Sequence, residues 1–111
     1  MTTTELNNRK YVEYYDSYMD HYTRARDFVS AVRTGNVKPG ALDEIEHHAV
    51  IARSAANRAR TWKQEFEPDD AKTILMWNKR ITELVKFENM VDEARREIAR
   101  VFDRELKKLG K

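Results

Sequence analysis

Residues 11–22 read YVEYYDSYMDHY and contain all five tyrosines of the chain. Four of them begin a series separated by alternating steps of four and three residues: Tyr11, Tyr15, Tyr18, Tyr22, Ala25, Val29 and Val32. This spacing places one side chain per turn along a single face of an α-helix, as in a coiled coil. Thr2 and Glu5 fit a capping box at the start of this helix, and Gly35 is a typical stop.

Few residues interrupt helices in the rest of the chain, which has only three glycines and two prolines. Two further apolar series follow: Ala41, Ile45, His48, Ala52, Ala55, Ala59, Trp62 and Phe66, then Ile74, Trp77, Ile81, Leu84, Phe87, Val91, Ala94 and Ile98. The sequence therefore predicts an all-α fold with one domain over residues 1–111 and helices at about 3–34, 41–66 and 68–109. Short turns make neighbouring helices antiparallel, so we expect an elongated, coiled-coil-like antiparallel three-helix bundle.

The tyrosines of the first helix are predicted to pack against alanines of the second. If the first turn is centred near residue 37, facing residues have numbers that sum to about 74. Large side chains then meet small ones, as close packing requires. The alternative is an aromatic platform for single-stranded nucleic acid, but acidic residues lie among the tyrosines and would repel phosphate. The predicted pairs are Tyr22 with Ala52, Tyr18 with Ala55 and Ala56, and Tyr15 with Ala59.

The third predicted helix is longer than the two beside it. The same counting at the second turn pairs Ala41 with Ala94, so about fourteen residues, roughly 20 Å of helix, project beyond the bundle. An apolar stripe that its own chain does not cover predicts a partner, either a second copy or another protein that binds an amphipathic helix. The alternative is a kink that folds this end back as a fourth helix. The stripe consists of Ile98, Val101, Phe102, Leu106 and Leu109.

A second feature is the stretch DEIEHHAV at residues 43–50. Glu44 lies three residues before His47 and four before His48, so a carboxylate and an imidazole share one helix face, as a metal site requires. A metal-binding helical bundle with Glu44, His47 and His48 as ligands is therefore one alternative function. Without a metal, we expect His48 at the rim of the seam, with His21 and His47 in solvent.

The Glu44-x-x-His47 pair resembles one part of the ferritin-like di-iron bundles, which imply an iron site built from two such pairs and two further glutamates. The resemblance covers four residues. The predicted third helix supplies Glu88, Asp92 and Glu93 but no second histidine, so the second pair of that family is missing.

The same histidines are similar in setting to the phosphorylated histidine of histidine phosphotransfer domains, which are helical bundles of comparable size. In that family a lysine and a glycine follow the histidine by three and four residues. Ile51 and Ala52 occupy these places after His48, and Val50 and Ile51 occupy them after His47. A phosphate would therefore lack the counter-charge of the lysine.

The second predicted helix also carries a basic run without an acid between residues 50 and 64. Such a run could contact phosphates, so a nucleic-acid-contacting helical protein is another alternative function. Against this, acids at the start of the helix and bases towards its end also complement the helix dipole. The run consists of Arg53, Arg58, Arg60 and Lys63.

Composition excludes several of the remaining classes of function. The net charge is +2, from 21 basic and 19 acidic residues, which is too balanced for an obligate DNA binder. The absence of cysteine excludes disulfides and thiolate metal sites. No apolar run suits a membrane span or a signal peptide, so we expect a cytoplasmic protein without a membrane partner. We find no pattern typical of a catalytic site and expect neither catalysis nor a cofactor.

These observations predict a non-catalytic protein-interaction or assembly module that acts through the apolar stripe of the C-terminal helix. Self-association into a homo-oligomer is the first expectation. A small accessory or inhibitor protein of viral type, docking on another protein, has the same features.

Overall fold

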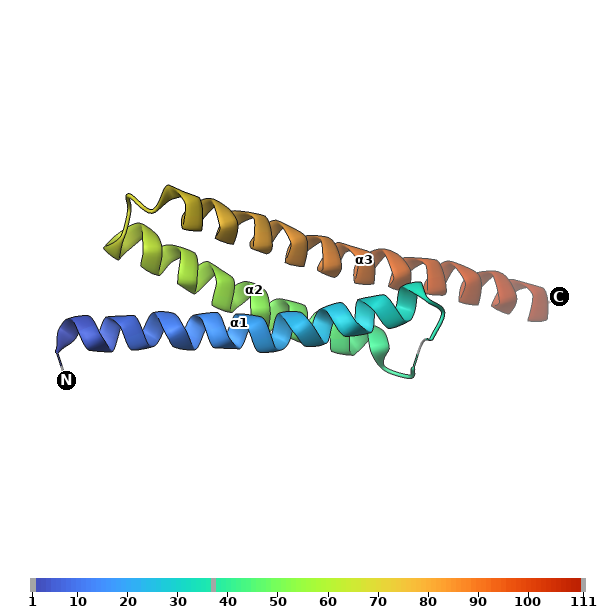
Figure 1. Cartoon of the computed structure of the whole chain (residues 1–111). Coiled ribbons are helices and arrows are strands. Elements are labelled where there is room, and N and C mark those ends of the chain that lie inside the picture. The colour runs from blue at the N-terminus through green and yellow to red at the C-terminus, as the bar shows by residue number, and fades with distance from the viewer. Residues whose placement is uncertain (1, 37, 111) are drawn as a thin grey trace.

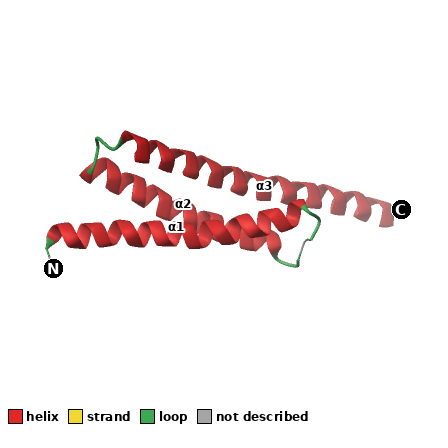
Figure 2. Cartoon of the chain, in the orientation of Figure 1, coloured by secondary structure: helices red, strands yellow, loops and turns green. Residues whose placement is uncertain are grey.

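The computed structural model describes residues 2–36 and 38–110. In chain order it contains α1 (Thr3–Arg33), α2 (Ala41–Phe66) and α3 (Ala71–Leu109). Figures 1 and 2 show three helices in which α2 runs antiparallel to α1 and α3 and packs against both, while the α1 and α3 backbones come close at few places. The molecule measures 71 × 22 × 21 Å. The predicted elongated three-helix bundle with a projecting last helix is confirmed.

The first helix begins where the sequence predicts. The Thr2 hydroxyl accepts the backbone N–H of Glu5 at 3.1 Å, and the Glu5 carboxylate accepts the backbone N–H of Thr2 at 3.4 Å. This reciprocal pair satisfies two N–H groups that have no partner inside the helix. At the other end, Gly35 has a φ of +80°, a left-handed conformation that glycine adopts without steric cost.

The third helix begins at Ala71, three residues later than the predicted position 68. Asp70 is the N-cap, and its Oδ1 accepts the backbone N–H of Thr73 at 3.3 Å. Pro68 and Asp69 form the turn instead. A side-chain oxygen at the N-cap satisfies a free helical N–H, which proline cannot do, so the capping residue and not the proline sets this boundary.

The core combines small side chains of α2 with larger side chains of α1 and α3. From α2 it takes alanines that are fully or almost fully buried: Ala49, Ala52, Ala55, Ala56 and Ala59. From α1 and α3 it takes larger residues, among them Tyr18 at 2% exposure and Trp77 at 0%. Burial raises the pKa of Tyr18 to about 12. Small side chains on the middle helix let both neighbouring helices approach it closely.

Four of the five tyrosines lie in the core or pack against it, as predicted. Tyr11, Tyr14 and Tyr22 are partly buried against it. Tyr15 differs from the prediction, because 37% of it is exposed. Its ring still meets the edge of Trp77, with centroids 5.9 Å apart.

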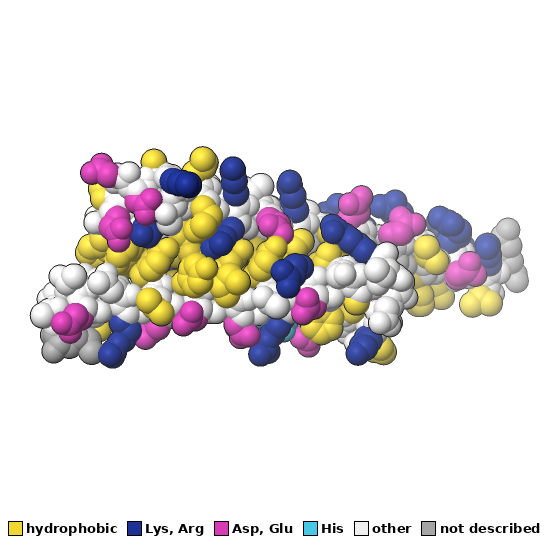
Figure 3. Space-filling model, viewed as in Figure 1, with side chains coloured by type: hydrophobic (Ala, Val, Ile, Leu, Met, Phe, Trp, Pro, Cys, Tyr) yellow, Lys and Arg dark blue, Asp and Glu magenta, His cyan; other side chains and the backbone are white. Residues whose placement is uncertain are grey.

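Trp77 joins α3 to α1. The backbones of these two helices lie apart over most of their length. Its ring meets Tyr18 edge-on at 5.2 Å between centroids, and its Nε1–H donates to the Tyr11 hydroxyl at 3.2 Å. The Arg80 guanidinium lies 4.9 Å from the Trp77 ring centroid. Figure 3 shows the resulting band of hydrophobic side chains between α1 and α3. Large aromatic residues thus span a gap that the small residues of α2 leave open.

Candidate functional site

The C-terminal part of α3 is the most exposed region of the described chain. Every residue from 96 to 110, a segment called the tip below, is exposed to solvent. The tip nevertheless carries five large apolar side chains, with these exposed fractions: Ile98 59%, Val101 44%, Phe102 62%, Leu106 50% and Leu109 82%. By contrast, Leu84 and Val91 earlier in the same helix are 0% exposed. The tip is therefore an apolar helical surface without cover.

The tip is uncovered because α2 is too short to reach it. Arg95 is the last residue of α3 for which the structure shows hydrogen bonds to α2, through Asp43 and Glu46 in the first turns of that helix. These bonds raise the pKa of Arg95, with Glu46 as the larger cause. Beyond Arg95, α2 has no further turns against which α3 can pack.

The tip does not fold back on the bundle. The helix runs without interruption from Ala71 to Leu109, and Figure 1 shows it continuing past the α1–α2 turn. The ion pairs described within the tip are local, between Arg100 and Glu97 at 3.2 Å and between Lys108 and Glu105 at 3.4 Å. A fourth, folded-back helix is thus contradicted.

The second candidate site brings together all three histidines of the chain. His21 from α1 and His48 from α2 have their Nδ1 atoms 2.8 Å apart. The His47 ring centroid lies 5.0 Å from that of His48 and 6.5 Å from that of His21. The sequence analysis placed His48 at the rim and His21 in solvent. His48 is instead buried, at 6% exposure, and the His21 side chain is 22% exposed.

The histidine cluster has carboxylates on both sides. Glu44 Oε2 lies 3.2 Å from His48 Nε2, and Asp20 Oδ2 lies 3.9 Å from His21 Nε2. The pKa of His21 is lowered, first by burial and then by the positive charge of its neighbours, while Asp20 opposes the shift. Among the described residues, no group of three or more histidine, aspartate or glutamate side chains could hold a metal ion with the side chains as they stand.

His21 is the site residue that the sequence analysis missed. The sequence predicts His21 in solvent and does not connect it with the histidine pair of α2. The available signal was its position beside Tyr22, a member of the seam, because a residue adjacent to a seam flanks the interface. The reach of the imidazole then brings it to His48.

The basic run of α2 does not form one free surface. Arg53 forms a two-pronged pair with Glu88, at 2.6 and 3.1 Å, and hydrogen bonding to Glu88 raises the pKa of Arg53. Arg60 donates to Asn57 and Asn78 at 3.1 and 2.9 Å.

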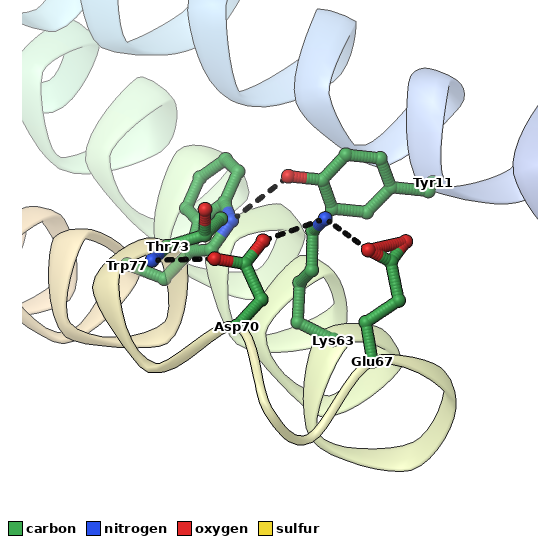
Figure 4. Close-up of polar contacts among 6 residues, drawn as sticks. All are labelled: Tyr11, Lys63, Glu67, Asp70, Thr73 and Trp77. Atoms are coloured by element: carbon green, nitrogen blue, oxygen red, sulfur yellow. Dashed lines mark hydrogen bonds and ion pairs between the residues drawn. The ribbon is translucent and has the colours of Figure 1, made fainter.

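Lys63 is only 9% exposed, and its Nζ lies between Glu67 at 3.1 Å and Asp70 at 3.2 Å (Figure 4). It also lies 4.9 Å from the centroid of the Tyr11 ring. Burial lowers the pKa of Lys63, but the two carboxylates outweigh this effect and the net pKa is raised. Lys63 thus anchors the α2–α3 turn. Of the four predicted phosphate contacts, Arg58 is the one that lies exposed, beside a shallow hollow that Lys10 also lines.

Comparison with models of known protein families, with curated protein sequences and with solved structures finds no match to this chain. Over the described residues, no helix is both long and apolar enough to cross a membrane.

Proposed function

We propose that this protein is a non-catalytic interaction module that self-associates through its tip. The observation that carries the proposal is the contrast along α3, where Val91 is fully buried and Phe102 is 62% exposed on one uninterrupted helix. A projecting helix of this length is marginal in water unless its apolar face is covered. A partner that covers the stripe would therefore stabilise both the contact and the helix.

A second copy is the partner that the dimensions favour. The length of helix that is uncovered in one tip equals the length that the tip of a second copy can cover. An antiparallel pair around a two-fold axis therefore lets each copy cover the other completely, and the contact closes without leaving a free surface of the same kind. If facing residues have numbers that sum to about 207, the end of the second tip reaches residue 97 of the first, just past the start of α2.

This register also matches four of the five apolar residues of the tip with apolar residues. Ile98 faces Leu109 of the second copy, and Val101 faces Leu106 of the second copy. Phe102 then lies opposite Glu105 of the second copy, next to the apolar Leu106.

The energetic balance predicts a reversible dimer. Complete burial of a large apolar side chain stabilises by roughly 1.5–3 kcal/mol, so ten half-exposed side chains contribute about 7–15 kcal/mol. Association costs about 4–15 kcal/mol in lost rotation and translation. A dissociation constant of about 1–100 µM corresponds to a net gain of about 5.5–8 kcal/mol, which the apolar contacts supply when the association cost lies near the lower end of its range.

The test is the molecular mass in solution over a range of concentrations. Sedimentation equilibrium or light scattering at about 1–300 µM should show the wild-type mass rising from monomer to dimer. The double variant Ile98→Asp with Phe102→Asp should remain a monomer. The matched control is Leu75→Asp, which places the same charge at a residue of α3 that is 55% exposed but lies within the bundle. The control should dimerise like the wild type.

Two results would overturn the proposal. One is a wild-type protein that stays monomeric at every concentration. The other is a double variant that dimerises as well as the Leu75→Asp control, because the mass would then come from another surface. Circular dichroism of each variant shows that the helices are retained.

A further inference from the structure

We infer that His21 and His48 form a binding site for a divalent transition-metal ion of the zinc class, with His47 as the third ligand. The site links α1 to α2 and lies outside the tip, so it does not depend on the proposed self-association. It differs from the ligand set that the sequence predicts, because His21 replaces Glu44 among the atoms that touch the ion.

The first argument is the distance between the two facing nitrogens. His21 Nδ1 and His48 Nδ1 are 2.8 Å apart. Two imidazole nitrogens that bind one tetrahedral Zn²⁺ at about 2.0–2.1 Å lie about 3.3 Å from each other. The two rings therefore need to separate by only about half an ångström to admit the ion between their Nδ1 atoms.

The second argument is the carboxylate behind each ring. Histidines that bind metals usually donate their other N–H to a carboxylate, which fixes the ring and makes it a better ligand. Glu44 is placed to accept from His48 Nε2 at 3.2 Å, and Asp20 lies 3.9 Å from His21 Nε2. Glu44 therefore directs His48 Nδ1 towards His21, while Asp20 lies beyond hydrogen-bond distance in the metal-free state and near enough to accept from His21 Nε2–H after a small movement.

The protons balance without an external acid or base. In the metal-free state, His48 Nε2–H donates to Glu44, so His48 Nδ1 accepts a hydrogen bond from His21 Nδ1–H. When an ion binds both Nδ1 atoms, the His21 proton is carried by Nε2 instead, on the side of Asp20. His21 changes tautomer, and both rings remain neutral, as metal ligation requires.

His47 completes the set of ligands. Its ring centroid lies 5.0 Å from that of His48, and its side chain is exposed, so it can rotate towards the ion. Water takes the fourth position, as in three-histidine zinc sites. The ion reaches the site from the side of His47 and the partly exposed His21. His48 packs against the Phe28 ring, with centroids 6.5 Å apart.

The test is isothermal titration of the untagged, chelator-treated protein with ZnSO₄ at pH 7.5, with MgCl₂ as the negative control. The wild type should bind one Zn²⁺ per chain and no Mg²⁺. His21→Ala and His48→Ala should each weaken zinc binding at least tenfold, because each removes a direct ligand. Glu44→Gln should weaken it by about 10-fold through the orientation of His48.

A second measurement uses the wild-type protein, so that the proposal can still be tested if the histidine variants fold poorly. Co²⁺ added to the wild-type protein should give the visible absorption of a tetrahedral site, and this absorption should disappear when Zn²⁺ is added. The titration is repeated in the Ile98→Asp, Phe102→Asp background, where one ion per chain should still bind. Failure of the tip proposal would therefore leave this result unchanged.

The inference is overturned if the wild type shows no zinc binding in the titration. It is also overturned if His21→Ala binds Zn²⁺ as tightly as the wild type, because the ion would then be held on α2 alone.

Discussion

The two parts of α3 have a similar periodicity but different surroundings. Between residues 71 and 95, apolar side chains such as Leu84 and Val91 are fully buried against α2 and the aromatic residues of α1. Between residues 96 and 110, Phe102 and Leu109 belong to the same continuous helix and lie 62% and 82% exposed. The sequence pattern alone does not distinguish them. The length of the neighbouring helix decides which apolar residues become core and which become an available surface.

The largest expected difference comes from removing one aromatic side chain in each part. Trp77→Ala should lower the free energy of unfolding by about 3–5 kcal/mol, because Trp77 is fully buried and joins α3 to α1. Phe102→Ala should change it by less than about 0.5 kcal/mol at concentrations where the protein is monomeric. Urea unfolding followed by circular dichroism measures both. Equal losses would mean that the tip is packed in the monomer.

A smaller difference is expected from adding volume to an alanine in each part. Ala56 is 0% exposed in the core, so Ala56→Leu should destabilise by about 1–3 kcal/mol through overpacking. Ala99 lies exposed in the tip, and Ala99→Leu should leave monomer stability nearly unchanged. Thermal unfolding of the two variants at the same low concentration makes the comparison. A tolerated Ala56→Leu would argue against close contact of α2 with its neighbours.

The smallest effect concerns pH and separates the bundle from the tip. Because the pKa of His21 is lowered in the folded state, the unfolded chain binds a proton more readily. Stability should be complete above the unfolded value of about 6.5 and fall as pH drops below it. The charged and titratable groups around His21 are Asp20 and Arg24 from α1 and Glu44, His47 and His48 from α2.

The measurement is the melting temperature of the monomer between pH 7.5 and 5.5, with His21→Gln as the comparison. The wild type should lose more stability over this range than the variant. The tip contains no histidine, so self-association of the folded protein should differ little between the two pH values. A His21→Gln variant with the same pH dependence as the wild type would contradict this assignment.

The architecture could be predicted because it depends on local rules. Heptad spacing, few breakers and the Thr2–Glu5 capping box place the helices, and the difference in length between α2 and α3 follows from counting residues. The start of α3 was predicted too early in the chain, because both Pro68 and Asp70 are acceptable near a helix N-terminus. Only the conformation of the turn shows that Asp70 is the capping residue.

The histidine cluster and the engaged arginines depend on contacts between helices. Counting along straight helices gives the approximate facing residue, but the reach and direction of side chains decide the actual contact. His21 was expected in solvent, although its ring meets His48. Arg53 likewise looked free in the sequence, because its partner Glu88 lies 35 residues away on α3. Pattern analysis along one helix cannot detect such pairs.

The most direct test of the central claim is amide hydrogen exchange along α3 at two protein concentrations, about 0.5 µM and about 200 µM, chosen on either side of the expected dissociation constant. Amides of residues 77–91 should exchange slowly at both. Amides of residues 98–109 should exchange rapidly in the dilute sample and become protected in the concentrated one. Protection of 98–109 that is equal at the two concentrations would contradict a tip that finds its cover in a second copy.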